Sequence, residues 1–221
     1  MDPKIIDIIV GLDLEMSQPS QRIIEIGVAV GSIVQRKILA SKSFFVNPHE
    51  PLSDFIKNLT HITQENVDAA PNLGDAYNSM VEFLLPFNPH RMVIQWGQGD
   101  ERTLKEQLSH CGQHFEWMFG RTAMNVKNIV QAHQIALGRH AQGGLAKSLL
   151  KYGLRFEGTK HRADSDAVNT LRLFFKMLDI LKTIELDPNK MALLARNSSS
   201  SASECQTLYL HDPKVQGQSV P

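Results

Sequence analysis

Acidic side chains and one histidine stand beside the ends of apolar segments, where a fold can bring them together. Asp13 and Glu15 close the first apolar run two residues apart, so a strand would point both carboxylates to one face. Asp100 follows another short apolar run in a glycine-rich turn, and His161 and Asp166 flank the start of a long amphipathic segment. Neighbouring carboxylates repel one another unless a cation lies between them. The set therefore predicts a cation site.

The chemistry of such a site follows from its donor atoms. An oxygen-rich set suits Mg²⁺ or Mn²⁺ rather than zinc. Two such ions, about 4 Å apart, can clamp a phosphodiester, activate a water molecule and stabilise the leaving oxygen. A histidine, with an ordinary pKa of about 6.5, can take the proton of that water at neutral pH. This combination indicates a nuclease.

Each of these residues also has an ordinary structural explanation. The pair Asp13 and Glu15 alone can be a solvated strand end, and Asp100 can be the N-cap of a helix. Asp166 can be an acid favoured by the dipole of the helix that it begins, with His161 in solvent. Three such coincidences at strand and helix ends favour one shared site.

The elements that must position these residues can be inferred from the apolar pattern. A run of apolar and β-branched residues at 5–10 predicts a first strand, which continues to the acids Asp13 and Glu15 that end it. Similar runs predict strands at 22–31, 37–46 and 91–96. Apolar residues at helical spacing predict helices at 76–84, 101–110, 126–137, 145–152 and 163–181. The first three strands have short connections and so form an antiparallel meander. The order of elements predicts an α/β fold with a mixed sheet flanked by helices.

Composition excludes several classes of protein. The 221 residues include 23 Lys and Arg against 23 Asp and Glu, which is unlike a protein that packages DNA by net charge. Two cysteines, Cys111 and Cys205, are too few for a disulfide framework or a four-cysteine zinc site. The N-terminal apolar run is too short to span a bilayer and lacks a cleavage site. We expect a cytoplasmic protein with no membrane partner.

The ordered set of acids and histidine resembles the DEDDh (DnaQ-like) 3′–5′ exonucleases, a superfamily with a ribonuclease H-like fold. The similarity covers about residues 5–181. Two further motifs resemble the branch that holds the histone-mRNA 3′ exonuclease and the bacterial KapD-type exoribonucleases: Trp96-Gly97-x-x-Asp100 and Phe156-Glu157-Gly158-x-x-His161. The resemblance implies a mixed five-stranded sheet, a nuclease domain at 1–186 and a C-terminal extension at 187–221. The Ser-rich composition predicts that this extension is flexible from about residue 197.

The resemblance also implies roles for the site residues. Two Mg²⁺ or Mn²⁺ ions would be held by four carboxylates and His161 would be the general base, which makes five catalytic residues: Asp13, Glu15, Asp100, Asp166 and His161. Met16 would contact the terminal nucleotide, and Ser17 stands where relatives usually carry Thr. The third motif departs from the family pattern at Asp164, which is either a further ligand or, as we favour, a solvated acid at a helix start.

A basic segment leads into the predicted base. Between Arg139 and Arg162 the only acid is Glu157. Such a run is usually a solvated helix face, but its position favours contacts with a phosphate backbone. The basic segment adds three residues to the two that the family resemblance implies, and we expect a substrate-binding set of five: Met16, Ser17, Lys147, Lys151 and Arg162.

These observations predict a metal-dependent exonuclease that removes nucleoside 5′-monophosphates from single-stranded 3′ ends. The narrower family resemblance favours RNA as the substrate. A DNA-directed exonuclease of the proofreading or repair kind is the first alternative. An inactive scaffold that binds nucleic acid is the second, and the presence of all five catalytic residues argues against it.

Overall fold

The computed structural model describes residues 7–87, 92–113 and 123–183. The chain divides into two compact units, Met1–Asp179 and Ile180–Pro221. The predicted C-terminal extension at 187–221 and its flexibility lie outside the described residues. Among the helices that are described, none is long and apolar enough to cross a membrane.

A five-stranded mixed sheet forms the centre of the first unit. Its strands are β1 (Ile8–Met16), β2 (Ile23–Ser32), β3 (Lys37–Phe45), β4 (Val93–Gln95) and β5 (Met124–Asn125). Their order is β3-β2-β1-β4-β5. The pairs β1–β2 and β2–β3 are antiparallel, whereas β4 runs parallel to β1 and β5 parallel to β4. The predicted meander and mixed sheet are confirmed.

The helices follow the predicted order, with two additions. The predicted ones are α3 (Leu73–Leu84), α4 (Asp100–His110), α5 (Val126–Ala136), α6 (Leu145–Lys151) and α7 (Ala163–Thr183). The additions are α1 (Asp54–Thr60) and α2 (Gln64–Asp68), and a 3₁₀ turn at Leu85–Phe87 follows α3. The side chain of Ser53 caps α1, and Thr63 forms a capping box with Asn66 at the start of α2. Both helices are too short to show an apolar stripe, so only their caps are visible in the sequence.

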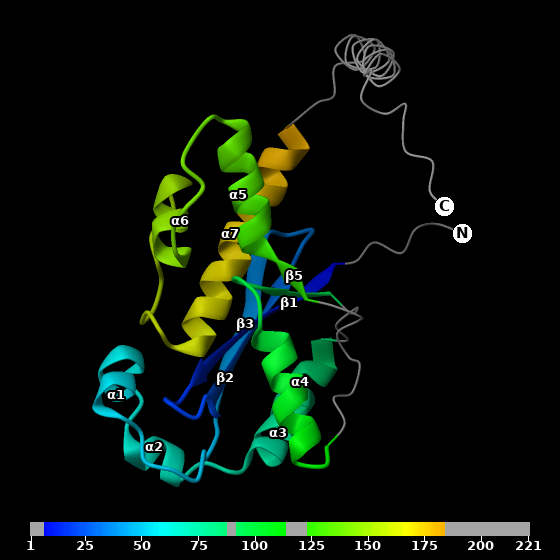
Figure 1. Ribbon diagram of the computed structural model, residues 1–221. Helices are drawn as coiled ribbons and strands as arrows, with labels where there is room; N and C mark the ends of the chain where they lie inside the picture. Colours follow the sequence, from blue (N-terminus) through cyan, green and yellow to red (C-terminus); the bar gives the residue numbers. More distant parts are fainter. Residues whose placement is uncertain (1–6, 88–91, 114–122, 184–221) are drawn as a thin grey trace, which may run out of the picture. The chain divides into compact units, whose positions relative to one another are not determined.

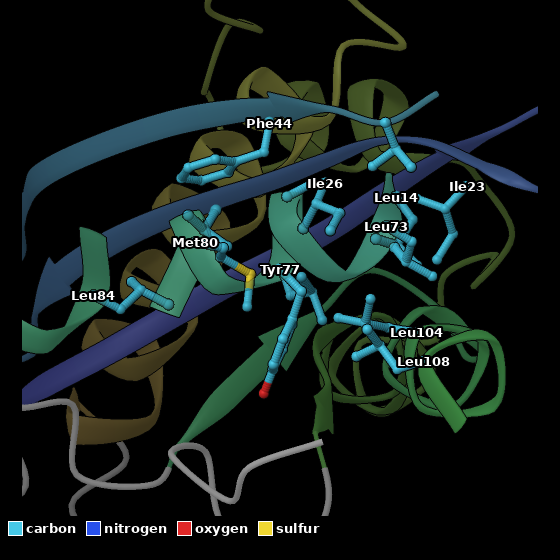
Figure 2. Close-up of a cluster of buried hydrophobic side chains, with 14 of the residues drawn as sticks. Leu14, Ile23, Ile26, Phe44, Leu73, Tyr77, Met80, Leu84, Leu104 and Leu108 are labelled. Carbon is cyan, nitrogen blue, oxygen red and sulfur yellow. The ribbon is translucent and has the colours of Figure 1, made fainter. Parts of the chain in front are cut away.

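The two faces of the sheet differ in how they are covered (Figure 1). On one face, alternate residues of β1 and β2 pack against α3 and α4. Figure 2 shows this cluster, in which Leu14 and Ile26 from the strands meet Tyr77, Met80 and Leu104 from the helices. All of these side chains are buried. This face is the hydrophobic core of the unit.

On the opposite face, α7 lies directly on the strand backbones. A Cβ atom on Gly27 of β2 would stand 1.9 Å from the carbonyl carbon of Ala163, and one on Gly11 of β1 would stand 2.7 Å from the carbonyl oxygen of Ala167. Only glycine allows an approach this close. Because Gly27 pairs with Asp13 across the sheet, the N-terminus of α7 lies beside the acids of β1.

Candidate active site

Strand β1 presents Asp13 and Glu15 to the face that α7 covers. Both residues have the same parity as Gly11, and pleating sends alternate side chains to opposite faces. Across the sheet, Asp13 pairs with Gly27 and Glu15 pairs with Glu25. The register shifts between Glu15 and Met16, where the regular strand pairing ends. Both carboxylates therefore lie at the end of β1 nearest the start of α7.

The start of α7 brings the third motif to these acids. His161 has a left-handed backbone, with φ at 60°. Its N–H donates to Oδ2 of Asp166 over 3.2 Å, and the N–H of Asp166 donates to the carbonyl of Arg162 over 2.9 Å. Ligand atoms of Glu15, His161 and Asp166 all lie within 4.8 Å of one another. The fold thus brings Glu15 from the first predicted motif close to His161 and Asp166 from the last.

A separate turn delivers Asp100 at the start of α4. The turn needs glycine twice, since Gly97 and Gly99 have φ values of 95° and 128°. The side chain of Gln95 accepts the N–H of Glu101 over 3.1 Å, and Asn125 accepts the N–H of Gly97 over 3.1 Å. Asp100 does not belong to the 4.8 Å group, but its charge acts on Asp13. It reaches the site from the β4 side.

Burial raises the pKa of every acid in the set, and repulsion by other acids of the set adds to the increase at Asp13 and Glu15. Burial raises the pKa of Asp13 well above its usual value, and the charges of Asp100, Asp166 and Glu15 raise it further. Burial, followed by the charge of Asp166, raises the pKa of Glu15 to about 8. Burial raises the pKa of Asp100 to about 7. For Asp166, burial raises the pKa to about 6 although the neighbouring His161 opposes the change.

This donor set fits divalent cations. The carboxylates of Glu15 and Asp166 lie close together, and those of Asp13 and Asp100 interact electrostatically with this pair. The nearby positive charges, Arg162 at Glu15 and His161 at Asp166, offset only part of the repulsion. Oxygen donors around an uncompensated negative charge are the ligands that Mg²⁺ and Mn²⁺ prefer. A cation placed there would relieve the repulsion that raises the pKa values.

Comparison with known proteins identifies the family of this chain. Residues 10–174 match the exonuclease family RNase T. The chain belongs to this exonuclease family. A similar curated protein is the PolC-type DNA polymerase III of Staphylococcus haemolyticus, 27% identical over 177 residues, which are 79% of this chain. The match spans only 11% of the length of that relative.

Solved structures of two nucleases have the same fold. One is the nuclease domain of 3′hExo, a DEDDh family member bound to rAMP, with a TM-score of 0.69, 21% identity and coverage of 80% of this chain and 94% of that one. The other is cell-death related nuclease 4, with a TM-score of 0.72, 19% identity and coverage of 79% and 64%. The family match confirms the predicted exonuclease family, and the two structures, one of which is a DEDDh family member, confirm the predicted ribonuclease H-like fold.

Most of the residues expected to bind the exonuclease substrate have partners within the protein. The hydroxyl of Ser17 is buried, donates to Glu50 over 2.6 Å and accepts the N–H of Arg22 over 3.1 Å. Lys151 donates from Nζ to the carbonyls of His140 and Gln142 over 3.0 Å each.

The other three substrate-binding predictions fall in different surroundings. Arg162 forms an ion pair with Glu25 over 2.7 Å. Lys147 is exposed on α6. Met16 lines a cavity of about 730 Å³ together with Arg22, His49 and His110. Substrate contact by all five residues stays a prediction.

Asp164 lies outside the group formed by Glu15, His161 and Asp166. Its Oδ1 accepts the N–H of the next residue, Ser165, over 2.7 Å. This local contact is typical of an acid in the first turn of a helix.

Sequence reasoning missed one buried acid beside this candidate site. Glu25 is fully buried on β2 and accepts hydrogen bonds from the side chains of Arg162 and Ser43 and from the N–H of Ala163. Its charge contributes to the raised pKa values of Asp13, Glu15 and Asp166. The only signal in the sequence is an isolated acid inside an apolar strand, a place where unpaired charges are costly.

Proposed function

We propose that this protein is a metal-dependent 3′–5′ exonuclease that hydrolyses the last phosphodiester of a single-stranded end. The observation that carries the proposal is the group formed by Glu15, His161 and Asp166, whose ligand atoms lie within 4.8 Å of one another. An imidazole beside two carboxylates of raised pKa combines a proton acceptor with a cation site. Membership of the RNase T exonuclease family supports this interpretation.

Two divalent ions, Mg²⁺ or Mn²⁺, would be held by carboxylates from three elements. Asp13 and Glu15 come from β1, Asp166 from α7 and Asp100 from the start of α4. When bound, the ions supply Lewis acidity that lowers the pKa of water and stabilises the leaving oxygen.

His161 would act as the general base. Its imidazole accepts a proton from the attacking water while the water oxygen bonds to phosphorus and the bond to the 3′ oxygen breaks. The proton balance closes when the leaving 3′ oxygen takes a proton from solvent. The products are one nucleoside 5′-monophosphate and a chain shortened by one nucleotide. The hydrogen bond from the N–H of His161 to Asp166 fixes the backbone that carries the imidazole.

RNA is the favoured substrate. Support comes from the sequence motifs of the histone-mRNA exonuclease branch and from the similar fold of 3′hExo, whose structure contains rAMP. DNA is the second candidate, because the similar PolC-type protein is a DNA polymerase. Family resemblance alone separates the two, since no contact in the described residues distinguishes the sugars.

The direct test is digestion of matched single-stranded RNA and DNA oligonucleotides, labelled at the 5′ end, with Mg²⁺ or Mn²⁺. We expect a ladder that shortens from the 3′ end, release of nucleoside 5′-monophosphates and faster loss of RNA. A chelator and the Asp13→Asn variant should each abolish the ladder.

Three results would separate the alternatives. Equal or faster digestion of DNA would replace RNA by the DNA-directed function. Equal residual cleavage by wild type and Asp13→Asn would show that a contaminant acts. Oligonucleotide binding without any cleavage at saturating Mn²⁺ would favour the inactive scaffold.

A further inference from the structure

The ion pair between Glu25 and Arg162 joins the sheet to the helix turn that carries the third motif. Arg162 donates to Glu25 through Nε over 3.1 Å and through Nη2 over 2.7 Å, and its guanidinium lies 5.1 Å from the ring centre of Phe45. The N–H of Ala163 donates to the second carboxylate oxygen of Glu25 over 3.0 Å. A buried carboxylate with donors at both oxygens is a specific and rigid arrangement.

We propose that Glu25 and Arg162 are a positioning pair that fixes His161 and Asp166 opposite the acids of β1. Arg162 then acts through Glu25 rather than by holding a substrate phosphate. The inference rests on the proposed nuclease function only for its kinetic consequences. The geometric part applies to the metal-free protein.

The covalent neighbourhood of the pair explains how it positions the site. Arg162 directly follows His161, and its carbonyl accepts the N–H of Asp166 over 2.9 Å. Holding Arg162 therefore constrains both residues of the motif. Since Gly27 has no side chain under Ala163, Glu25 supplies the polar anchor that fixes this end of α7 on the sheet.

The negative charge of Glu25 has a second consequence. Arg162 also interacts electrostatically with Glu15 and Asp164, which are both close enough to affect its pKa. Without the charge of Glu25, the guanidinium would be drawn toward Glu15, where it would compete with a divalent cation. Glu25 thus holds the Arg162 guanidinium beside the site but away from the position that a divalent cation would occupy.

The test uses Glu25→Gln, Arg162→Lys and a matched control in the same helix. Arg36, in the turn between β2 and β3, forms an ion pair with Asp179 of α7 over 2.8 Å, outside the third motif. Asp179→Asn therefore removes an ion pair of α7 without touching the site. Each variant is examined by amide hydrogen exchange without metal, by Mn²⁺ titration calorimetry and by kcat and KM on an oligonucleotide.

We expect Glu25→Gln to speed exchange at the amides of His161 and Ala163 by about 10-fold or more, with little change at residues 171–177. Its Mn²⁺ affinity and kcat should fall by about 10- to 100-fold while KM stays within about 2-fold. Arg162→Lys should change the same quantities in the same direction. Asp179→Asn should leave all of them within about 2-fold.

Arg162→Lys keeps a positive charge at this position. It therefore distinguishes a positioning role of Arg162 from a phosphate contact even where Glu25→Gln does not fold. A KM raised about 10-fold in Arg162→Lys, with unchanged kcat and unchanged exchange at His161, would identify a phosphate contact and overturn the proposal. Absence of nuclease activity in the wild type would refute the proposed function alone. Unchanged exchange at His161 and Ala163 in both variants would refute the positioning pair alone.

Discussion

The face of the sheet under α3 and α4 carries large apolar side chains, whereas the face under the start of α7 carries glycine and charged side chains in their place. Leu104 and Met80 are completely buried on the first face. On the second, Gly27 allows backbone contact with Ala163, and the polar contacts of Glu25 replace apolar packing. The first arrangement removes apolar area from water and stabilises the unit. The second brings charged groups from distant segments close together.

The difference teaches how stability and activity are divided in this fold. Convergent carboxylates with raised pKa values destabilise the metal-free protein, since each favours its neutral form. The apolar face must offset that loss. Replacing a repelling carboxyl group should therefore raise stability and lower activity, whereas truncating a buried apolar side chain should lower stability and spare activity.

The largest expected effect is that of Asp13→Asn on the charged face. We expect kcat to fall by at least about 10³-fold, equivalent to roughly 4 kcal/mol, because a cation ligand is lost. The metal-free variant should unfold at a higher temperature than wild type, because the buried surroundings and acidic neighbours that raise the pKa of Asp13 disfavour its ionised carboxylate, whereas an asparagine amide stays neutral. Oligonucleotide kinetics and thermal denaturation check the two parts. A variant that is both inactive and less stable would contradict the comparison.

On the apolar face, Leu104→Ala should give the converse result. Removing a fully buried leucine side chain should lower the free energy of unfolding by about 2–5 kcal/mol. The kcat per folded molecule should stay within about 3-fold of wild type. The Leu104 side chain packs in the apolar cluster and carries no group that could bind a cation or accept a proton. Urea denaturation with activity measured at low temperature separates the two quantities.

Gly27→Ala tests the close approach of α7. The new methyl group would meet the backbone of Ala163, so the helix must move and stability should fall by about 3 kcal/mol. Activity should also fall by about 10-fold or more, because His161 and Asp166 move with the helix. Gly144→Ala is the control, since a Cβ there meets nothing within 4 Å. Full activity in Gly27→Ala would show that the contact with the sheet does not position the site.

The smallest expected effect is the pH dependence of stability without metal. Glu15 and Asp166 have folded-state pKa values of about 8 and about 6, above their unfolded values. The folded protein therefore binds more protons than the unfolded chain, and stability falls as pH rises from about 5 to 8. With allowance for solvent screening, we expect a loss of about 1–2 kcal/mol. Glu15→Gln should reduce the slope, and a wild-type stability that rises with pH over this window would contradict the assignment.

Much of the fold could be predicted because its signals are local. The β-branched runs, the stripe of α7 and the two-residue spacing of Asp13 and Glu15 report periods of 2 and 3.6 directly. The short helices α1 and α2 and the two-residue strand β5 carry no such period. Their existence depends on caps and on neighbouring strands.

The tertiary partners of charged residues could not be predicted in this way. The base-rich segment that ends at Arg162 predicts a phosphate contact, and nothing in it indicates the hydrogen bonds that the guanidinium of Arg162 forms with Glu25, 137 residues away in the sequence. The sequence shows glycines at 11 and 27, but their role in allowing the close approach of α7 follows only from the three-dimensional structure. A pairing across such a separation leaves no periodic trace in one sequence.

The measurement that most directly tests the central claim is Mn²⁺ titration calorimetry at pH 7 in buffers of different ionisation enthalpy. Because the pKa values of Glu15 and Asp100 are about 8 and about 7, the metal-free site holds protons that a cation must displace. We predict saturable Mn²⁺ binding that releases roughly one to two protons per molecule, and its loss in Asp13→Asn. Absence of binding, or binding of wild type and Asp13→Asn with equal affinity and no proton release, would contradict the account.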